Sequence, residues 1–572
     1  MGVGIFPIFV FLFAVCFHGL ASSSPTGQNY EFVHEATTAP ATSYYDYIVI
    51  GGGTAGCPLA ATLSANSTVL LLERGGSPYG NPNVTDLSAF GKALSDLSGE
   101  SPSQRFVSED GVINARARVL GGGSCINAGF YTRAAPGYAD AAGWDGRRVN
   151  ESYGWVEEVV AFRPPMRQWQ SAVKEGLVES GVHPDNGFTY DHLVGTKVGG
   201  TIFDGEGRRH TAADLLKYAD AKGITVLLHA SVHKILFRIK GKERPLAHGV
   251  VFRDGLGNKH KAYLNNGPKN EIILSAGSLG SPQLLMLSGV GPLDHLKAHN
   301  ISVVLDQPLV GQGMSDNPMN AIYVPSPTPV EVSLIQVVGI TSFGSYIEAA
   351  SGENFAGSPT QRDFGMFSPK IGQLSTLPPK QRTEEALTKV IESMQQIDPM
   401  VFKGGFILEK VMGPFSKGHL LLKTKNPNDN PSVTFNYFQD PKDLQRCVQG
   451  LNMIESVIES KSFSKFRYDY LTLPRLLNMT ASAPVNLLPR HTNSSISLEQ
   501  FCKDTVMTIW HYHGGCQVGR VVDSDYRVFG VDSLRIVDGS TFEFSPGTNP
   551  QATVMMLGRY MGVKLLEERL KS

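Results

Sequence analysis

The sequence has almost no charge imbalance and no extended basic segment. Its 572 residues include 51 Lys and Arg against 52 Asp and Glu, which gives a formal net charge of -1 at pH 7. Proteins that bind nucleic acid or anionic membranes through electrostatics need clustered positive charge. We therefore expect neither partner, and we expect a small molecule instead.

Long apolar runs are confined to residues 5–17, IFPIFVFLFAVCF. This block is short for a membrane span, which needs about 20 residues. Gly19 and Ala21 follow it and are typical of a signal-peptidase site, so we predict a signal peptide over 1–21, a mature chain from about Ser22 and secretion. No Lys or Arg precedes the block, which leaves an uncleaved anchor as the alternative. If the signal peptide is cleaved, we expect no stable membrane span to remain.

Cysteine is scarce, with 6 residues and no CxxC pair, which argues against zinc-finger and thioredoxin chemistry. Removing the leader removes Cys16 and leaves an odd number, so at least one thiol is free or pairs between molecules. Glycosylation sequons agree with secretion, although Asn66 lies beside a predicted strand. They are Asn66, Asn83, Asn150, Asn300, Asn478 and Asn493.

The length and the 41% hydrophobic content allow more than one domain. Residues 22–43 are rich in Ser, Thr, Ala and Pro and predict a flexible lead-in. Ordered structure is expected from Tyr44, where YYDYIVIGGGTAGCPLAATLSANSTVLLLERGG begins. Its β-branched run 47–50 and its apolar run 69–72 predict two strands.

A Gly51-x-Gly53-x-x-Gly56 motif between these strands opens a predicted helix that runs to about Ser64. Glu73 ends the second strand, 22 residues after Gly51. In such a unit the glycines allow a tight turn, close approach of a pyrophosphate and close helix packing, and the helix amides receive the anion. Glu73 would hold an adenosine ribose and repel a 2′-phosphate, which disfavours NADP. NAD and FAD both remain open at this point.

Two later stretches are rich in glycine. RARVLGGGSCINAGFYTR (116–133) places Ser124 and Asn127 where they could hydrogen-bond a flat polar ring system. GSLGSPQLLMLSGVG (277–291) follows an apolar strand at 272–274 and predicts a helix that opens at Pro282, a favoured first-turn residue.

These segments, together with VGQGMSDNP (310–318) and RIVDGSTFEFSPGTNPQATVMMLGRYMG (535–562), resemble the glucose-methanol-choline (GMC) oxidoreductases in one consistent order from Tyr44 onward. Within that family the chain is similar to the plant branch of HOTHEAD-like proteins and flavin-containing mandelonitrile lyases. The resemblance implies FAD as cofactor. RVLGGGSCIN (118–127) lacks a histidine for a covalent link, so we expect the FAD to be non-covalent.

The resemblance also implies an α/β fold, in which a Rossmann-like FAD-binding domain is interleaved with a smaller substrate-binding domain of a sheet plus helices. We expect residues 44–318 to be mainly FAD-binding, 319–500 mainly substrate-binding, and 501–572 to return to the FAD-binding domain. The FAD-binding residues that it implies are Gly51, Gly53, Thr54, Ala55, Gly56, Glu73, Arg74, Val119, Gly122, Ser124, Asn127, Val232, Asp538, Gly539, Asn549, Pro550 and Gln551. A turn or helix cap is the alternative role for Asp538.

In the sequence WHYHGGC (510–516), the family pattern implies that His511 is the catalytic base at the flavin N5 face. His513 would point to the other side of an extended segment and play a supporting role. Asn549, the second catalytic position, cannot act as a base and can only orient or stabilise the substrate oxygen. A metal site at the two histidines would need a third ligand, and we expect none.

The implied function is oxidation of a CH-OH group to an aldehyde, with His511 taking the hydroxyl proton as hydride passes to flavin N5. A long-chain ω-hydroxy fatty acid in cuticle formation is the candidate substrate, and the electron acceptor stays open. The alternative is a hydroxynitrile lyase, in which we would expect a Tyr in place of Ile509 and a His in place of Asn549. A flavin-binding protein without turnover is a third hypothesis.

Further expectations concern the remaining chain. GHLLLKTK (418–425) predicts a strand, and residues 358–385 are either a lid over the pocket or a surface loop. Cys447 and Cys502 flank a loop and are the candidates for a disulfide pair. Cys57, Cys125 and Cys516 are expected to pack in the core, and Pro550 is expected to begin the final helix.

Overall fold

The structure, a computed structural model, describes residues 30–96, 98–352, 404–482 and 497–571. The predicted signal peptide, the sequon at Asn493 and the segment 358–385 lie outside these ranges. Within the described ranges, no helix is both long enough and apolar enough to cross a bilayer.

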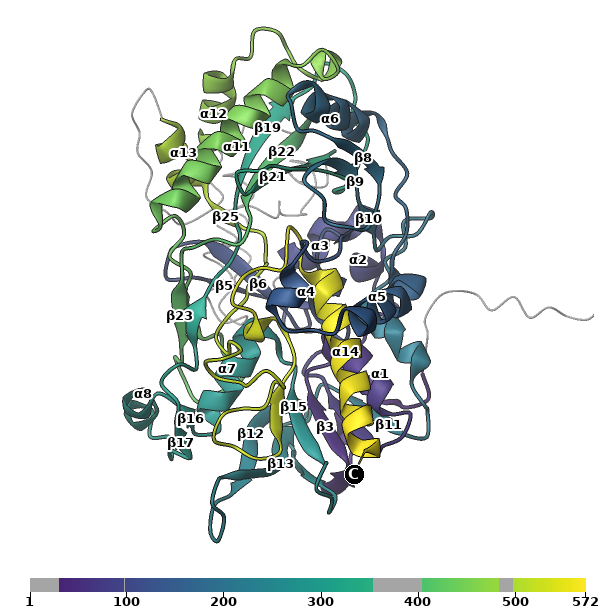
Figure 1. The fold of residues 1–572 in the computed structure, drawn as a ribbon, viewed down its shortest axis with the longest axis vertical. Coiled ribbons are helices and arrows are strands. Elements are labelled where there is room, and N and C mark those ends of the chain that lie inside the picture. Colours follow the sequence, from purple (N-terminus) through teal and green to yellow (C-terminus); the bar gives the residue numbers. More distant parts are fainter. Residues whose placement is uncertain (1–29, 97, 353–403, 483–496, 572) are drawn as a thin grey trace, which may run out of the picture.

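A six-stranded parallel sheet forms the lower half of the molecule in Figure 1. Its central strands are apolar runs buried on both faces, as is typical of parallel sheets. In spatial order the strands are β1 (Val33–Glu35), β11 (Ile224–Leu228), β4 (Val69–Leu72), β3 (Tyr47–Ile50), β15 (Glu271–Leu274) and β26 (Leu534–Ile536). The strands predicted at 47–50, 69–72 and 272–274 are confirmed, and so is the α/β class.

Alternate residues of these strands enter two different cores. Val49 and Leu71 pack under helices α1 (Gly56–Leu63), α5 (Gly146–Val160) and α14 (Gln551–Leu570). Ile48 and Leu70 face helix α7 (Gly277–Leu287) and a second, four-stranded sheet. That sheet has the order β12 (Ser231–Arg238), β13 (Leu246–Arg253), β14 (Lys259–Leu264) and β2 (Thr42–Tyr45).

The prediction of a flexible lead-in is wrong for residues 30–43. Strand β1 pairs in parallel with β11, and β2, which begins at Thr42, pairs in parallel with β14. Each strand has only three or four residues, and its partner lies about 190 to 220 positions later in the chain. The amino-acid composition of this segment does not reveal pairing with such distant strands, so the composition alone indicated a flexible linker.

A mixed seven-stranded sheet forms the upper half in Figure 1. Its order is β25 (Met507–Thr508), β19 (Pro318–Pro325), β22 (Gly404–Val411), β21 (Ser345–Ser351), β20 (Val337–Ile340), β9 (Gly195–Val198) and β8 (Asp185–Phe188). Helices α6 (Gln168–Glu179), α11 (Pro441–Glu459), α12 (Leu473–Ser482) and α13 (Leu498–Thr505) pack on one face. The other face carries a smaller apolar cluster that includes Phe130 and Ile509.

A small three-stranded sheet joins the two halves: β18 (Gln312–Met314), β23 (Gly418–Leu421) and β24 (Ser432–Thr434). The strand predicted over 418–425 therefore ends at Leu421. The reason is that the next backbone N–H, that of Leu422, donates to His295 Nε2 at 3.0 Å instead of to a strand. Leu420 and Leu422 pack in the same core as α7.

Shorter elements connect these layers. They are α2 (Pro82–Thr85), α3 (Phe90–Ser95), β5 (Ser103–Val107), β6 (Ile113–Ala117), β7 (Phe130–Tyr131), α4 (Tyr138–Ala141), β10 (Gly200–Thr201), β16 (Val290–Gly291), α8 (Leu293–Ala298) and β17 (Leu305–Asp306).

Helix α7 begins at Gly277, five residues before the predicted start, so Pro282 lies inside the helix. The Asp538 carboxylate explains the earlier start, because its Oδ2 accepts from Gly277 N at 2.9 Å and from Ser281 Oγ at 2.5 Å. A distant residue thus fixes the first turn.

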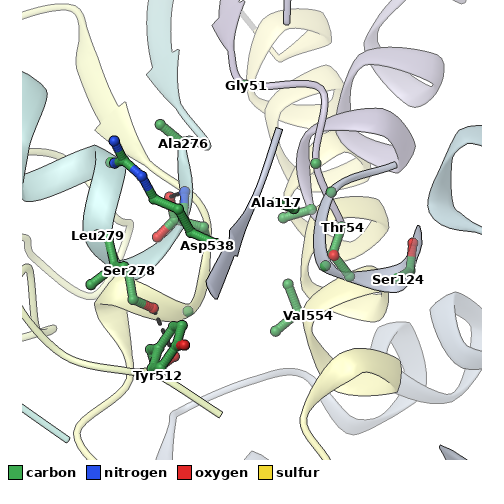
Figure 2. Close-up of a pocket in the computed structure, with 18 of the residues that line it drawn as sticks. Gly51, Thr54, Ala117, Ser124, Ala276, Ser278, Leu279, Tyr512, Asp538 and Val554 are labelled. Atoms are coloured by element: carbon green, nitrogen blue, oxygen red, sulfur yellow. Dashed lines mark hydrogen bonds between the residues drawn. The ribbon is translucent and has the colours of Figure 1, made fainter. Parts of the chain in front are cut away.

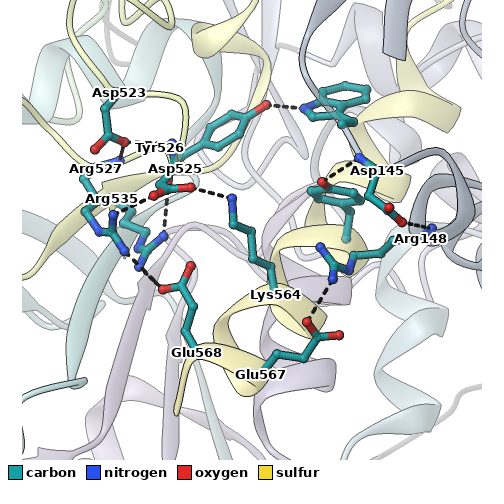
Figure 3. A network of polar contacts seen from close by, with 12 residues as sticks. Asp145, Arg148, Asp523, Asp525, Tyr526, Arg527, Arg535, Lys564, Glu567 and Glu568 are labelled. Carbon is teal, nitrogen blue, oxygen red and sulfur yellow. Dashed lines mark hydrogen bonds and ion pairs between the residues drawn. The ribbon is translucent and has the colours of Figure 1, made fainter. Parts of the chain in front are cut away.

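Ion pairs hold the C-terminal half of α14 against its surroundings, as Figure 3 shows. Lys564 binds Asp525, and Glu568 binds both Arg535 and Arg527, at distances of 2.5 to 3.2 Å. Arg148 of α5 reaches Glu567 at 2.9 Å. These contacts fix the long helix, and therefore the position at which its first turn lies.

Cys447 and Cys502 form a disulfide, so the predicted pair is confirmed. It links α11 to α13, directly before β25 and the segment that contains His511. Cys57, Cys125 and Cys516 are free and buried, as expected.

Candidate functional site

A long cavity lies between the two halves, and most of the predicted site residues line it. Figure 2 shows Thr54, Ser124 and Val554 on one side and Ser278, Leu279 and Tyr512 opposite them. The predicted residues at its wall are Gly51, Gly53, Thr54, Ala55, Glu73, Arg74, Val119, Gly122, Ser124, Asn127, Val232, His511, Asp538, Gly539, Asn549, Pro550 and Gln551. Gly56 is absent from the wall and is the first residue of α1.

Glycine is needed in the β3–α1 turn for reasons of space. Gly51 has φ +105°, and a Cβ there would lie 2.4 Å from Ser275 O. A Cβ on Gly56 would lie 1.9 Å from Gly51 O, so the helix could not start this close to the strand. The turn is therefore as tight as the motif predicts.

The Glu73 carboxylate holds this turn through hydrogen bonds to its backbone. Its Oε2 accepts from Gly52 N at 3.0 Å and its Oε1 from Gly75 N at 2.8 Å. Burial raises the pKa of this carboxyl, although the two backbone N–H groups oppose the shift. Its neighbour Arg74 donates to Gln104 and to Ala117 O, so its side chain braces the wall.

Two helices begin at the cavity without a side-chain cap. Helix α1 starts beside Gly53 and Thr54, and α14 starts beside Asn549 and Pro550. Uncapped first turns present N–H groups that favour anionic ligand groups. The start of α14 at Gln551 comes one residue after the predicted start.

Three predicted polar side chains are already bonded within the protein. The Ser124 hydroxyl donates to Gly121 O and accepts from Ala212 N, and Asn127 bridges Gln551, Gly129 N and Arg209. Asp538 binds Ser540 N at 2.8 Å as well as the start of α7. The carboxylate of Asp538 thus has the capping role that was its alternative.

His511 lies on an extended segment that pairs with residues 315–317. Ser315 and His513 exchange two backbone hydrogen bonds of 2.9 Å. Trp510, directly before His511, has φ +60°, a left-handed conformation that costs a non-glycine residue about 1–2 kcal/mol. Thr508 Oγ1 holds Trp510 N at 2.8 Å and Asp316 Oδ1 holds His511 N at 2.8 Å.

The imidazole of His511 is bonded on one nitrogen. Asn317 Nδ2 lies 3.1 Å from Nδ1, and the Tyr346 hydroxyl lies 3.4 Å from the same atom. Burial, the nearby Lys410 and His513 lower the pKa of His511 well below its usual value. The ring is therefore neutral at pH 7 and able to accept a proton.

His513 points away from the cavity wall, and its Nδ1 contacts His511 O at 3.0 Å. Burial lowers its pKa to about 3. Among the described residues, no group of three or more His, Cys, Asp or Glu side chains is placed to hold a metal ion.

Behind Asn549 lies a buried ion pair that the sequence reasoning missed. Glu348 of β21 and Lys410 of β22 bind each other with both side chains fully buried. Burial raises the pKa of Glu348, and the nearby Lys410 and Asn549 oppose the shift. Lys410 Nζ also lies 5.6 Å from the centre of the Tyr346 ring. A signal existed, because charged residues inside the apolar runs SYIEAAS and GGFILEKV are unusual for buried strands.

Asp316 and Asn317 were also missed, although both lie in the quoted stretch VGQGMSDNP. Asp316 Oδ2 accepts hydrogen bonds of 2.6 Å from the hydroxyls of Tyr437 and Thr508. Near His511 the remaining wall is apolar and includes Phe130, Ile335 and Ile509.

Comparisons with known proteins agree with this geometry. Residues 45–319 and 414–558 match the two family models described as GMC oxidoreductase. The chain is 51% identical to Protein HOTHEAD of Arabidopsis thaliana, over 98% of each chain. It is 48% identical to the (R)-mandelonitrile lyase-like protein of Arabidopsis thaliana, over 94% of this chain and 93% of that one.

Two more distant proteins extend the comparison. Sinalpyl alcohol oxidase Nec3 of Nesocodon mauritianus is 40% identical, over 99% of this chain and 97% of the other. A formate oxidase structure from Aspergillus oryzae RIB40, which concerns the effect of a mutation on FAD modification, matches with a TM-score of 0.71 at 18% identity, over 93% of this chain and 100% of that one. At that identity the likeness concerns the fold.

Proposed function

Because this chain belongs to the GMC oxidoreductase family and is an FAD-dependent oxidoreductase, we propose that it oxidises the CH-OH group of a small-molecule alcohol to an aldehyde, with His511 as the base. One observation carries the proposal: among the described residues, the hydrogen bonds of the neutral His511 ring are all at Nδ1, and its side chain lines the cavity. Nε2 is thus the nitrogen available to a substrate hydroxyl.

The residues present fit FAD. The turn at Gly51–Gly56 leaves backbone N–H groups open at the start of α1, and a buried carboxylate, that of Glu73, lies under that turn. The uncapped start of α14 offers a second site for negative charge. We propose that the cofactor is held without a covalent bond, since 118–127 offers no histidine.

When bound, FAD supplies the two-electron acceptor for the C–H bond of the alcohol. His511 takes the hydroxyl proton at Nε2, and its lowered pKa keeps it unprotonated until that moment. Asn549, which lines the cavity, holds the substrate oxygen. Phe130, Ile335 and Ile509 keep water from this end of the cavity.

The apolar wall supports an alcohol with a hydrophobic body, and a long-chain ω-hydroxy fatty acid stays our candidate substrate. The 40% identical relative named as an alcohol oxidase supports the reaction class. The electron acceptor is open to experiment.

A hydroxynitrile lyase is the second candidate, because a 48% identical relative is named lyase-like. Against it, the residue at 509 is an apolar Ile with 8% exposure, which offers a departing cyanide no hydrogen bond. Lys410 supplies positive charge near His511, but Glu348 neutralises it.

We also propose that the protein is secreted and glycosylated. The apolar leader and the sequons support this, and the disulfide agrees with an oxidising compartment. Expression of the full chain in plant cells, followed by N-terminal sequencing of protein from the medium, tests it. Retention of Met1 on cell-bound protein would contradict it.

The decisive experiment mixes the purified holoenzyme without oxygen with primary alcohols, ω-hydroxy fatty acids and mandelonitrile. Flavin absorbance and released cyanide are followed together. Loss of the flavin absorbance with an alcohol and no cyanide supports the proposal. Cyanide release with the flavin absorbance unchanged would establish the lyase instead. A flavin that stays with the acid-precipitated chain would contradict non-covalent binding.

A further inference from the structure

The hydrogen-bond partners of the His511 ring are unevenly distributed. Asn317 and Tyr346 both approach Nδ1, whereas the described part of the chain provides no hydrogen-bond partner for Nε2. Asn317 is fully buried, and it directly precedes Pro318, the first residue of β19. A side chain held this firmly can determine which ring nitrogen carries the hydrogen.

A neutral imidazole has one N–H and one free lone pair. If His511 is to accept a substrate proton at Nε2, its own hydrogen must lie on Nδ1. That hydrogen needs an acceptor, since the ring is buried. An Asn317 amide that points its Nδ2 at Nδ1 would donate instead, and the hydrogen would then remain on Nε2, where it blocks the base.

In that orientation the side-chain oxygen of Asn317 has no hydrogen-bond donor. Asn317 Oδ1 is buried and has no hydrogen-bond partner among the described residues. The other contacts of Nδ2, to Ser545 Oγ and Thr548 O, are both long at 3.4 Å. A half-turn about the Cβ–Cγ bond brings Oδ1 against Nδ1–H and gives the oxygen a partner.

Tyr346 favours the same arrangement. Its hydroxyl donates to Thr548 O at 2.9 Å, so its oxygen can only accept from the His511 ring, 3.4 Å away. An N–H on Nδ1 suits both neighbours.

We propose that Asn317 is a positioning residue whose side-chain oxygen accepts the Nδ1 hydrogen of His511, so that Nε2 is free to take the proton of the substrate. The inference rests on the proposed function, since it assigns Nε2 as the base. It also explains why an amide, rather than a carboxylate, stands here: Asp at 317 would favour a protonated ring, which cannot act as a base.

Other charged or titratable groups also face His511. Asp316 accepts its backbone N–H, and Lys410 and His513 both lower its pKa. The tests therefore change residue 317 alone and compare each variant with the parent chain.

The first test observes the tautomer directly in the resting holoenzyme. Protein labelled with ¹⁵N-histidine is compared with the His511→Gln variant to identify the ring signals of residue 511. We expect a protonated Nδ1 and a bare Nε2 in the parent chain, and loss of this preference in Asn317→Ala. A bare Nδ1 in the parent, or an unchanged tautomer in Asn317→Ala, would overturn the proposal. Tyr346→Phe then shows whether Tyr346 holds the hydrogen instead.

The second test uses the pH profile of alcohol-driven flavin bleaching in Asn317→Asp. This variant keeps the shape of the side chain and adds a charge, so the acid limb should move up by about 1–3 units. Asn452→Asp, a matched charge change on an exposed position of α11, should leave the limb in place. Equal profiles for both variants would refute the role of Asn317.

The two tests separate the inference from the proposed function. If no alcohol bleaches the flavin while the Nδ1–H tautomer is found and depends on Asn317, the proposed function fails and the hydrogen bond stands. If alcohols bleach the flavin but the His511 tautomer is the same in the parent chain and in Asn317→Ala, the inference alone fails. Retained FAD in each variant shows that it has folded.

Discussion

Two buried carboxylates, Glu73 and Asp316, lie under opposite ends of the cavity, and they are held in different ways. Glu73 accepts from Gly52 N and Gly75 N, both within 21 residues of it. Asp316 accepts from Thr508, Tyr437 and His511, each at least 121 residues away. The Glu73 end is thus built locally, whereas the His511 end is assembled from distant segments that must all be in place.

Replacing His511 should have the largest effect, and it should affect the reaction at the His511 end of the cavity. His511→Gln removes the group that accepts the hydroxyl proton, so alcohol-driven flavin bleaching should slow by about 10²–10⁴-fold. FAD content should stay the same, because the Glu73 end is intact. Stopped-flow absorbance measures the rate, with His299→Gln, directly after α8, as the control. Bleaching within a factor of ten of the parent would remove His511 from the mechanism.

Breaking the buried ion pair should destabilise the fold beneath the His511 end. Lys410→Met leaves Glu348 buried without its partner, at a cost of about 3–5 kcal/mol. Denaturant unfolding of the holoenzyme measures the loss. Adding Glu348→Leu should recover most of it, because neither charge then remains. A single variant as stable as the parent would mean that Glu348 is neutral in the native protein.

Glu73→Gln tests the Glu73 end of the cavity, where the carboxylate holds the β3–α1 turn. An amide oxygen can satisfy only one of the two N–H groups, so one buried donor is left unpaired at a cost of about 1–3 kcal/mol. The purified variant should retain less FAD, while any FAD-loaded fraction should react at the parent rate. The absorbance ratio at 450 and 280 nm gives the FAD content. A full complement of FAD would show that the turn holds without Glu73.

The last comparison concerns the pH dependence of stability at the His511 end. Burial raises the pKa of Asp316 from 3.8 to about 7, although hydrogen bonds from Thr508, Tyr437 and His511 oppose the shift. Between these values the folded chain holds a proton that the unfolded chain has lost, so this group makes stability fall as pH rises. Asp316→Asn cannot titrate.

The stability of Asp316→Asn relative to the parent should therefore increase from pH 4 to pH 7 and stay level above pH 7. Urea unfolding at several pH values gives both curves, and the difference between them cancels the other titrating groups. A constant difference would place the pKa of Asp316 near its ordinary value.

The sequence predicted what neighbouring residues determine. The strands at 47–50 and 69–72, the glycine turn and the pairing of Cys447 with Cys502 are confirmed by the structure. The flexible lead-in predicted for residues 30–43 and the predicted start of α7 were wrong, because partners about 190 to 260 positions away determine these structures.

In the candidate site, too, the residues that were predicted differ from those that were missed in whether the surrounding sequence indicates their role. Glu73 was found from its spacing to Gly51, and His511 from the resemblance to a family. Asn317 carries no local signal of its role, and Glu348 and Lys410 stand out only as charges inside apolar strands. Their partners come from other strands and from the segment around His511. A buried charge in an apolar strand marks such a position but does not name its partner.

The interleaving of the two sheets also sets an order for biosynthesis. The parallel sheet begins with residues 33–35 and is closed by β26 at 534–536, and α14 covers it last. A ribosome releases these pieces far apart in time, so the N-terminal strands emerge long before their neighbours. Because residues from the β3–α1 turn and from α14 line the same cavity, we expect stable cofactor binding only after α14 has been synthesised.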